Sequence, residues 1–202
     1  MTTSSGLTTA RTPDGSEKFI EEGAVSYVQA TIAIKEFARV IQEECEKIAV
    51  GRLDEINRSM GTTLSEEDLR YWPRKGRLLD PNVPWLCIWF TLKDIGALNL
   101  GFYWQSLPDG TYRLHAVAGL QFDEQRLFQG AREKSRGLKN SKFRAFPDGI
   151  QGNHLTISEP IPAEQTALFP KSIDSVLTGF LEECERIGGL QALKESRPKA
   201  MK

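Results

Sequence analysis

Apolar residues follow a helical period over the first part of the chain. Between Ala24 and Met60 they recur every three or four residues, which predicts one long helix. A 3.5-residue repeat would bring Arg52 and Glu55 onto the apolar stripe, so we expect a straight helix on a globular core and not a coiled coil. Weak alternation at residues 27–34 leaves a short strand as an alternative there. The apolar positions are Ile34, Phe37, Ala38, Ile41, Cys45, Ile48, Leu53, Ile56 and Met60.

Alternation of side-chain character begins at residue 85 and predicts β structure. Three strands are expected, at residues 85–92, 97–105 and 112–120. The turn Pro108-Asp109-Gly110 joins the last two, because proline presets the first turn position and glycine supplies a positive φ. The short connections predict an antiparallel meander.

Turn and capping residues delimit the remaining elements. A final helix at residues 172–187 begins at Ser172 and ends before Gly188-Gly189. The other expected elements are a short helix begun by a capping box at Ser65 and ended by Pro73, a helix at 123–136, a loop at 138–153, and a strand at 154–157 cut off by Pro160.

The chain is predicted to form one α+β domain. Its fold is an antiparallel meander of three to four strands packed by a long N-terminal helix and a C-terminal helix. The domain is expected at residues 21–190, in a chain of 202 residues that suits a single domain. Residues 1–20 are rich in threonine and serine and predict a disordered leader. Residues 191–202 are predicted to form a basic C-terminal tail.

The predicted meander has two unlike faces, because successive strand residues point to opposite sides. One face is apolar throughout and is expected to lie under the helices. The apolar face holds Leu86, Ile88, Phe90, Leu92, Leu98, Leu100, Phe102, Trp104, Tyr112, Leu114, Ala116, Ala118 and Leu120.

The second face combines aromatic, basic and small side chains. Tryptophan, tyrosine and arginine are enriched at the energetic centres of protein interfaces. The face therefore predicts a partner-binding surface made by Trp85, Trp89, Tyr103, Arg113 and His115. One alternative is a second packing layer, in which another helix covers the aromatic rings. Stacking of nucleic-acid bases on the rings is a further alternative.

The charges nearly cancel but are unevenly placed. The chain has 26 basic and 27 acidic residues, yet residues 70–78 hold four basic residues and no acidic one, and residues 132–144 hold six against one. Basic groups interleaved with aromatic rings suit a polyanion, although charged loops are usually just solvated. The candidate anion- or nucleic-acid-binding residues are Arg70, Trp72, Arg74, Lys75, Arg77, Arg132, Lys134, Arg136, Lys139, Lys142 and Arg144.

Motifs for catalysis and metal binding are missing from the sequence. The three cysteines are far apart and form no C-x-x-C pair, and neither histidine has metal-ligand spacing. Nucleophile-elbow, phosphate-loop and dinucleotide-binding motifs are absent too. We expect no metal site and no cofactor. The weak enzymatic candidates are Cys87 with His115, on one strand face, and His154 with Asp148 and Glu159, which are near in sequence.

These observations favour a soluble cytoplasmic binding protein of the inhibitor, immunity-type or adaptor class. It would engage a partner protein through its aromatic sheet face, and no stretch approaches the length of a membrane span. One alternative is a nucleic-acid- or phosphate-binding protein that acts through residues 70–78 and 132–144. Another is an enzyme of unknown reaction. A homodimer through the aromatic face or an exposed strand edge is also open.

Overall fold

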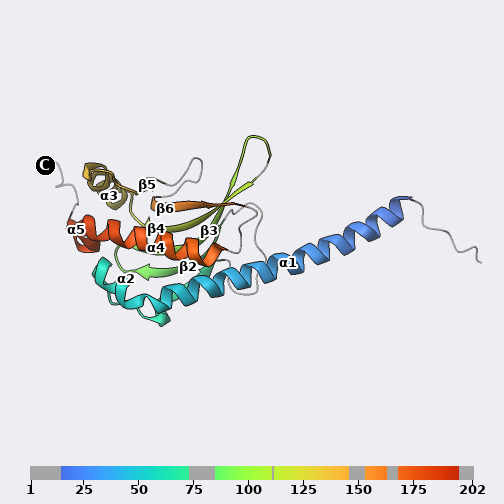
Figure 1. Ribbon diagram of the computed structural model, residues 1–202, viewed down its shortest axis with the longest axis horizontal. Helices are drawn as coiled ribbons and strands as arrows, with labels where there is room; N and C mark the ends of the chain where they lie inside the picture. Colours follow the sequence, from blue (N-terminus) through green and yellow to red (C-terminus); the bar gives the residue numbers. More distant parts are fainter. Residues whose placement is uncertain (1–14, 73–84, 111, 146–152, 163–167, 196–202) are drawn as a thin grey trace, which may run out of the picture.

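An antiparallel sheet with helices on one side organises the chain (Figure 1). The computed structural model describes residues 15–72, 85–110, 112–145, 153–162 and 168–195. The strands are β1 (Leu69–Trp72), β2 (Trp85–Leu92), β3 (Gly96–Ser106), β4 (Tyr112–Phe122), β5 (Arg144–Ala145) and β6 (His154–Ile161). The helices are α1 (Gly15–Gly51), α2 (Leu53–Met60), α3 (Gln125–Gly137), α4 (Phe169–Arg186) and α5 (Gly189–Glu195), with a one-turn 3₁₀ helix at Glu66–Asp68.

The predicted α+β class and the meander are confirmed. The strand order is β1-β2-β3-β4-β6-β5, and each neighbouring pair is antiparallel. Strands β2, β3 and β4 lie within two residues of the expected bounds. The described residues hold six strands instead of three or four, because β1 and the two-residue β5 add one strand at each edge.

The helices cover the apolar face of the sheet, as expected. α1 lies against β2 and β3, while α4 lies against β4 and β6. On this covered face Leu100 and Phe102 are only 2% and 3% exposed, and Leu177 and Phe180 of α4 are fully buried. Burial of each such side chain contributes roughly 1.5–3 kcal/mol. A one-residue slip would move all of them into water, so this face sets the strand register.

The single helix predicted from Ala24 to Met60 is two helices, α1 and α2. Arg52 separates them with φ −115° and ψ 17°, outside the helical range. Its guanidinium bonds to Glu55 at 2.7–2.8 Å and reaches across to Asp174 and Thr178 of α4 at 2.8 Å. These bonds anchor the chain to α4 where the helix breaks, a long-range tie that the local apolar period does not reveal.

The N-terminal part of α1 extends beyond the sheet (Figure 1). Ile41 is in the core and 7% exposed, whereas Ile34 is 41% and Tyr27 is 70% exposed on the same helix. The strand considered at residues 27–34 does not form, since these residues are helical. α1 also includes residues 15–20 of the segment predicted as a leader.

Two predicted helix starts differ from the structure. Ser65 forms the capping box, with its backbone N–H donating to Asp68 Oδ2 at 2.9 Å, but the following turn is 3₁₀ and the chain then enters β1. Ser172 is not a cap, because α4 already begins at Phe169 and buries Ser172 within it. Pro170 stands in the first turn of α4, where its fixed φ favours a helix start.

Two predicted ends also change. Pro160 does not stop β6, which runs to Ile161. β5 pairs only with Leu155 and Thr156, so Pro160 faces no ladder partner on that side among the described residues, and an edge tolerates proline. The helix α4 ends before Gly188 as predicted, but Gly189 begins the short helix α5, which extends through residues 191–195 of the expected tail.

Candidate binding site

The face of the sheet opposite the helices is called the open face, because no helix of the described residues packs on it. Cross-strand pairing defines its members. They are Arg70, Trp72, Trp85, Cys87, Trp89, Thr91, Ala97, Asn99, Gly101, Tyr103, Gln105, Arg113, His115, Val117, Gly119, Gln121, Arg144, His154, Thr156, Ser158 and Pro160.

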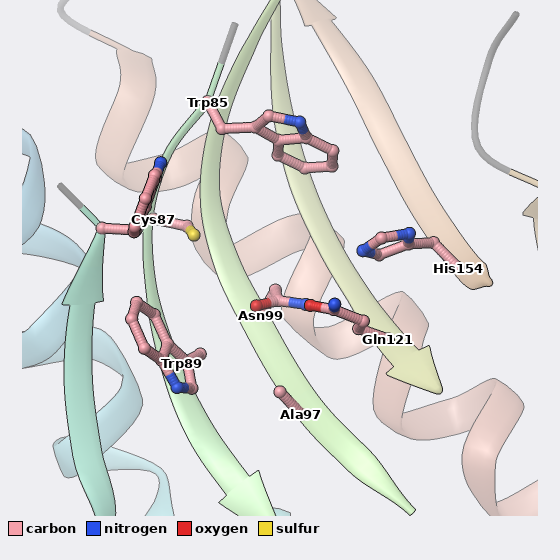
Figure 2. Close-up of a pocket in the computed structure, with 8 residues that line it drawn as sticks. Trp85, Cys87, Trp89, Ala97, Asn99, Gln121 and His154 are labelled. Carbon is pink, nitrogen blue, oxygen red and sulfur yellow. The ribbon is translucent and has the colours of Figure 1, made fainter. Parts of the chain in front are cut away.

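The open face contains a hollow of about 380 Å³, here called the tryptophan hollow (Figure 2). That volume lies in the lower part of the range of small-ligand sites, about 300–1,000 Å³. Its lining is mostly apolar and comes from β1, β2, β3, β4 and β6. The lining residues are Trp72, Trp85, Cys87, Trp89, Ala97, Asn99, Gln121 and His154.

Tryptophans form the walls of the hollow. Three of the four tryptophans in the chain are Trp72, Trp85 and Trp89, all of which line it, so the concentration of indole rings is specific to this face. Trp72 is 46% exposed, and Trp85 and Trp89 are half-buried. An exposed indole leaves a large apolar area in water, which makes such a cluster a candidate contact site.

Two glycines, Gly101 and Gly119, occupy neighbouring central strands of the open face. A Cβ on Gly101 would lie 2.2 Å from the Leu86 carbonyl oxygen, and one on Gly119 would lie 2.7 Å from Thr156 Cγ2. Neither position accepts a side chain without a shift of its neighbours, as expected where strand backbones approach closely. The open face therefore has no side chain at these two positions of β3 and β4.

Three polar side chains, those of Asn99, Gln121 and His154, also line the hollow. The side chains of Asn99 and Gln121 point toward one another from β3 and β4, and the ring of His154 points toward the same space from β6 (Figure 2). Neither amide makes a side-chain hydrogen bond with any residue that the structure describes. The hollow thus combines apolar walls with a few convergent polar groups, as ligand sites commonly do.

Aromatic contacts connect the hollow to the rest of the predicted partner-binding surface. The ring centroid of Trp85 lies 5.4 Å from that of Tyr103 and 5.8 Å from that of His154. Tyr103 in turn lies 6.0 Å from His115. Trp85 and Trp89 line the hollow, whereas Tyr103 supports Trp85 from beside it, and Arg113 and His115 lie outside the lining.

The enzymatic candidates find no support in the described residues. β3 separates Cys87 from His115, and burial raises the pKa of the Cys87 thiol to about 12, so it is not a thiolate nucleophile at neutral pH. Burial, and then the charge of Arg113, lower the pKa of His115 below its ordinary value. Glu159 pairs with Ala116 on the covered face, opposite to His154, and Asp148 lies outside the described residues.

The two basic segments lie at opposite edges of the sheet as far as they are described. Arg70 on β1 and Arg144 on β5 end one cross-strand row, Arg70–Trp89–Asn99–Gly119–Thr156–Arg144. Five strand spacings of about 4.8 Å separate them by roughly 24 Å. The structure does not bring these segments into one patch, and Arg74, Lys75 and Arg77 lie outside the described residues.

Several basic side chains of residues 132–144 form hydrogen bonds or ion pairs with other residues of this chain. Lys134 donates to the Ala192 carbonyl, and Lys142 pairs with Glu182 at 2.9 Å. Arg144 Nη1 donates to the carbonyls of Ser141 and Phe143 at 2.7 and 2.9 Å. Arg132, Arg136 and Lys139 belong to α3 and the turn after it, on elements that pack against α5 and α4. None of these residues lines the tryptophan hollow.

Sequence patterns alone missed the polar side of the hollow. Asn99 was on the expected second face, but Gln121 lay one residue beyond the strand expected to end at Leu120. His154 reaches the hollow only because β6 pairs with β4, with His154 opposite Gln121. The alternation of side chains continues through Gln121 and could have extended the predicted strand to it. The pairing of β6 with β4 cannot be recognised from any local sequence pattern.

Two further kinds of feature are absent from the described residues. They contain no group of three or more histidine, cysteine or acidic side chains placed to hold a metal ion. Among the same residues, no helix has the length and apolar character needed to cross a membrane. Comparisons with protein-family models, with curated proteins and with solved structures find no match for this chain.

Proposed function

We propose that this chain is a binding protein that engages a partner protein through the tryptophan hollow of its open face. The observation that carries the proposal is the gathering of Trp72, Trp85 and Trp89, each incompletely buried, around one hollow on the face that the described helices leave uncovered. Buried aromatic anchors in pockets carry most of the binding energy of protein interfaces. The three free cysteines suit a reducing cytoplasmic setting.

The geometry favours this function over the two alternatives. A nucleic-acid surface needs basic groups that converge, whereas the described parts of the two basic segments lie at opposite edges of the sheet. Nucleophilic catalysis needs an activated nucleophile, whereas burial raises the pKa of Cys87, the thiol that lines the hollow, to about 12.

A site-specific cross-link tests the proposal in the native host. A photo-reactive amino acid replaces Thr91, an exposed open-face residue beside Ala97, and in a matched control it replaces the exposed Leu168 at the start of α4. We expect a protein adduct from position 91 that is absent from position 168. The adduct should be lost with W85A/W89A and should survive nuclease treatment, and the captured protein should then bind the purified chain directly.

Two results would contradict this function. One is an adduct that persists in a folded W85A/W89A variant, which would place the contact elsewhere. The other is a nuclease-sensitive adduct, which would make nucleic acid the bound partner. Circular dichroism of the double variant separates loss of the hollow from loss of the fold.

A further inference from the structure

The charges of the open face are one-sided. Its strand positions hold three arginines and two histidines and no aspartate or glutamate. Glu159 is the only acidic residue within the strands that the structure describes, and it points to the covered face. Since the whole chain has 27 acidic residues against 26 basic ones, this face differs from the average surface and complements an acidic partner.

Two of these arginines bracket the tryptophan hollow. Arg70 and Arg144 end the same cross-strand row, and the row passes through Trp89 and Asn99 of the hollow. Both arginines are exposed, and their hydrogen bonds to backbone carbonyls of the described residues use Nη1 alone. Guanidinium groups have five N–H donors, so Nη2 and Nε of each remain available to a carboxylate.

The spacing of the two arginines sets the length of chain that would fit. Their separation of roughly 24 Å corresponds to about seven residues of extended peptide, at about 3.4 Å per residue. The hollow lies between them. A segment that crosses the strands would therefore place a central residue in the hollow and its two ends against the arginines.

The hollow itself favours an aromatic side chain with a polar edge. Flat indole walls pack well against a flat ring in offset or edge-to-face geometry. The amides of Asn99 and Gln121, which line the hollow, offer both hydrogen-bond donors and acceptors. They suit a phenol hydroxyl or an indole N–H. The volume of about 380 Å³ admits one such side chain.

Resting on the binding function above, we propose that the hollow holds a tyrosine or tryptophan side chain from an extended acidic segment of the partner. The carboxylates of that segment lie against Arg70 and Arg144. A single-stranded nucleic acid fits less well, because it stacks successive bases along a track of rings and cations, whereas here the rings surround one hollow and the cations stand at its two distant ends.

Synthetic peptides test the ligand chemistry on the full-length protein. The probe is an acetylated, amidated heptapeptide with a central tyrosine, glycine–serine spacers and two glutamates at each end. Binding is followed by calorimetry and by the NMR signals of the indole N–H groups. We expect the tyrosine-to-alanine peptide to bind about a hundredfold more weakly, and the glutamate-to-lysine peptide about tenfold more weakly.

Protein variants assign the contacts. R70A and R144A should each weaken the acidic peptide about threefold and reduce the dependence of its affinity on salt, whereas R113A, on the same face but outside the row, should not. The exposed residue Gln121 gives a variant with little risk to the fold. Q121L should weaken the tyrosine peptide and leave a phenylalanine peptide unchanged.

The proposal is overturned if the lysine peptide binds as well as the acidic one, if the alanine peptide binds as well as the tyrosine one, or if an eight-nucleotide oligothymidylate shifts the same indole signals at lower concentration. It also fails if the cross-linked partner lacks an acidic aromatic segment, although the binding function then stands. If the peptide binds as expected but position 91 captures no protein, the binding function fails while the chemistry of the hollow holds.

Discussion

Leu100 and Asn99 are neighbours on β3, yet they belong to two very different surfaces. Leu100 points into the core under the helices and is 2% exposed, while Asn99 lines a solvent-reached hollow with an amide that no described residue bonds. The same contrast holds along each long strand, because side chains alternate. The covered face is apolar and closed, whereas the open face is aromatic, basic and incompletely buried.

This contrast indicates which side chains are needed for the fold and which are available for function. Covered-face side chains stabilise the fold and set the register, so their replacement changes the free energy of unfolding. Open-face tryptophans are less completely buried, since Trp72 is 46% exposed and Trp85 and Trp89 are half-buried, so we expect them to contribute less to the fold. Their clustering on this face is the observation on which the proposed binding function rests.

The largest effect that tests this contrast comes from the Leu100 and Asn99 pair. Leu100→Ala should lower the free energy of unfolding by about 3–5 kcal/mol, because it removes buried surface and leaves a cavity. Asn99→Ala should change it by less than about 1 kcal/mol, since Asn99 has no described hydrogen bond to lose. Urea unfolding measures both. Similar losses would show that the open face is part of the core.

The thiol of Cys87 tests whether the bottom of the hollow is dry. Burial raises its pKa to about 12, so its thiolate fraction is small at pH 8 and keeps rising about tenfold per pH unit up to pH 10. We expect alkylation by iodoacetamide to be at least about a hundredfold slower than that of free cysteine at pH 8, without the levelling near pH 9 that an exposed thiol shows.

Site-resolved mass spectrometry distinguishes Cys87 from Cys45 and Cys184, which are also buried with raised pKa values. Protein unfolded in urea supplies the control, in which all three thiols should react quickly and level off at the ordinary pKa. A folded-state rate at Cys87 that levels off near pH 9 would mean that water reaches the bottom of the hollow.

The two halves of α1 repeat the contrast along one helix. Ile41 and Ile34 are seven residues, or about two turns, apart on the same helix, but Ile41 is 7% exposed in the core and Ile34 is 41% exposed beyond the sheet. Ile41→Ala should cost about 2–4 kcal/mol. Ile34→Ala should change stability by less than about 0.5 kcal/mol, because alanine's higher helix propensity offsets the small loss of burial. Equal costs would mean that the projecting half packs as firmly as the rest.

The sequence predicted the fold well where its signals are local. Alternation from Trp85 to Leu120 placed three strands, and the period from Ile34 to Met60 placed the helix that covers them. It failed at β1, where Glu66, Glu67 and Asp68 indicated a helix start, and at Arg52, whose bonds to α4 fix the break between α1 and α2. Those features depend on partners far along the chain.

The site was only half predictable for the same reason. Trp85 and Trp89 alternate on one strand, so their common face was visible in the sequence. Trp72 and His154 join them through the pairing of β1 with β2 and of β6 with β4, which no local pattern encodes. The relative position of the two basic segments was the least predictable property of the site. The basic residues near Lys142 are separated from those near Arg70 by the whole width of the sheet.

The smallest expected effect concerns the ion pair between Lys142 and Glu182, which joins the segment before β5 to α4. Both side chains are 56% exposed, and their atoms are 2.9 Å apart. Exposed pairs contribute about 0–1 kcal/mol, because water screens the charges and two long side chains lose freedom. In a double-mutant cycle with Lys142→Ala and Glu182→Ala, we expect a coupling energy below about 0.5 kcal/mol, decreasing with added salt.

Lys142→Ala should also leave the affinity for the acidic peptide unchanged, whereas Arg144→Ala, two residues along, should lower it. Equal effects of the two on peptide binding would mean that general positive charge attracts the ligand, and not the arginine at the end of the cross-strand row.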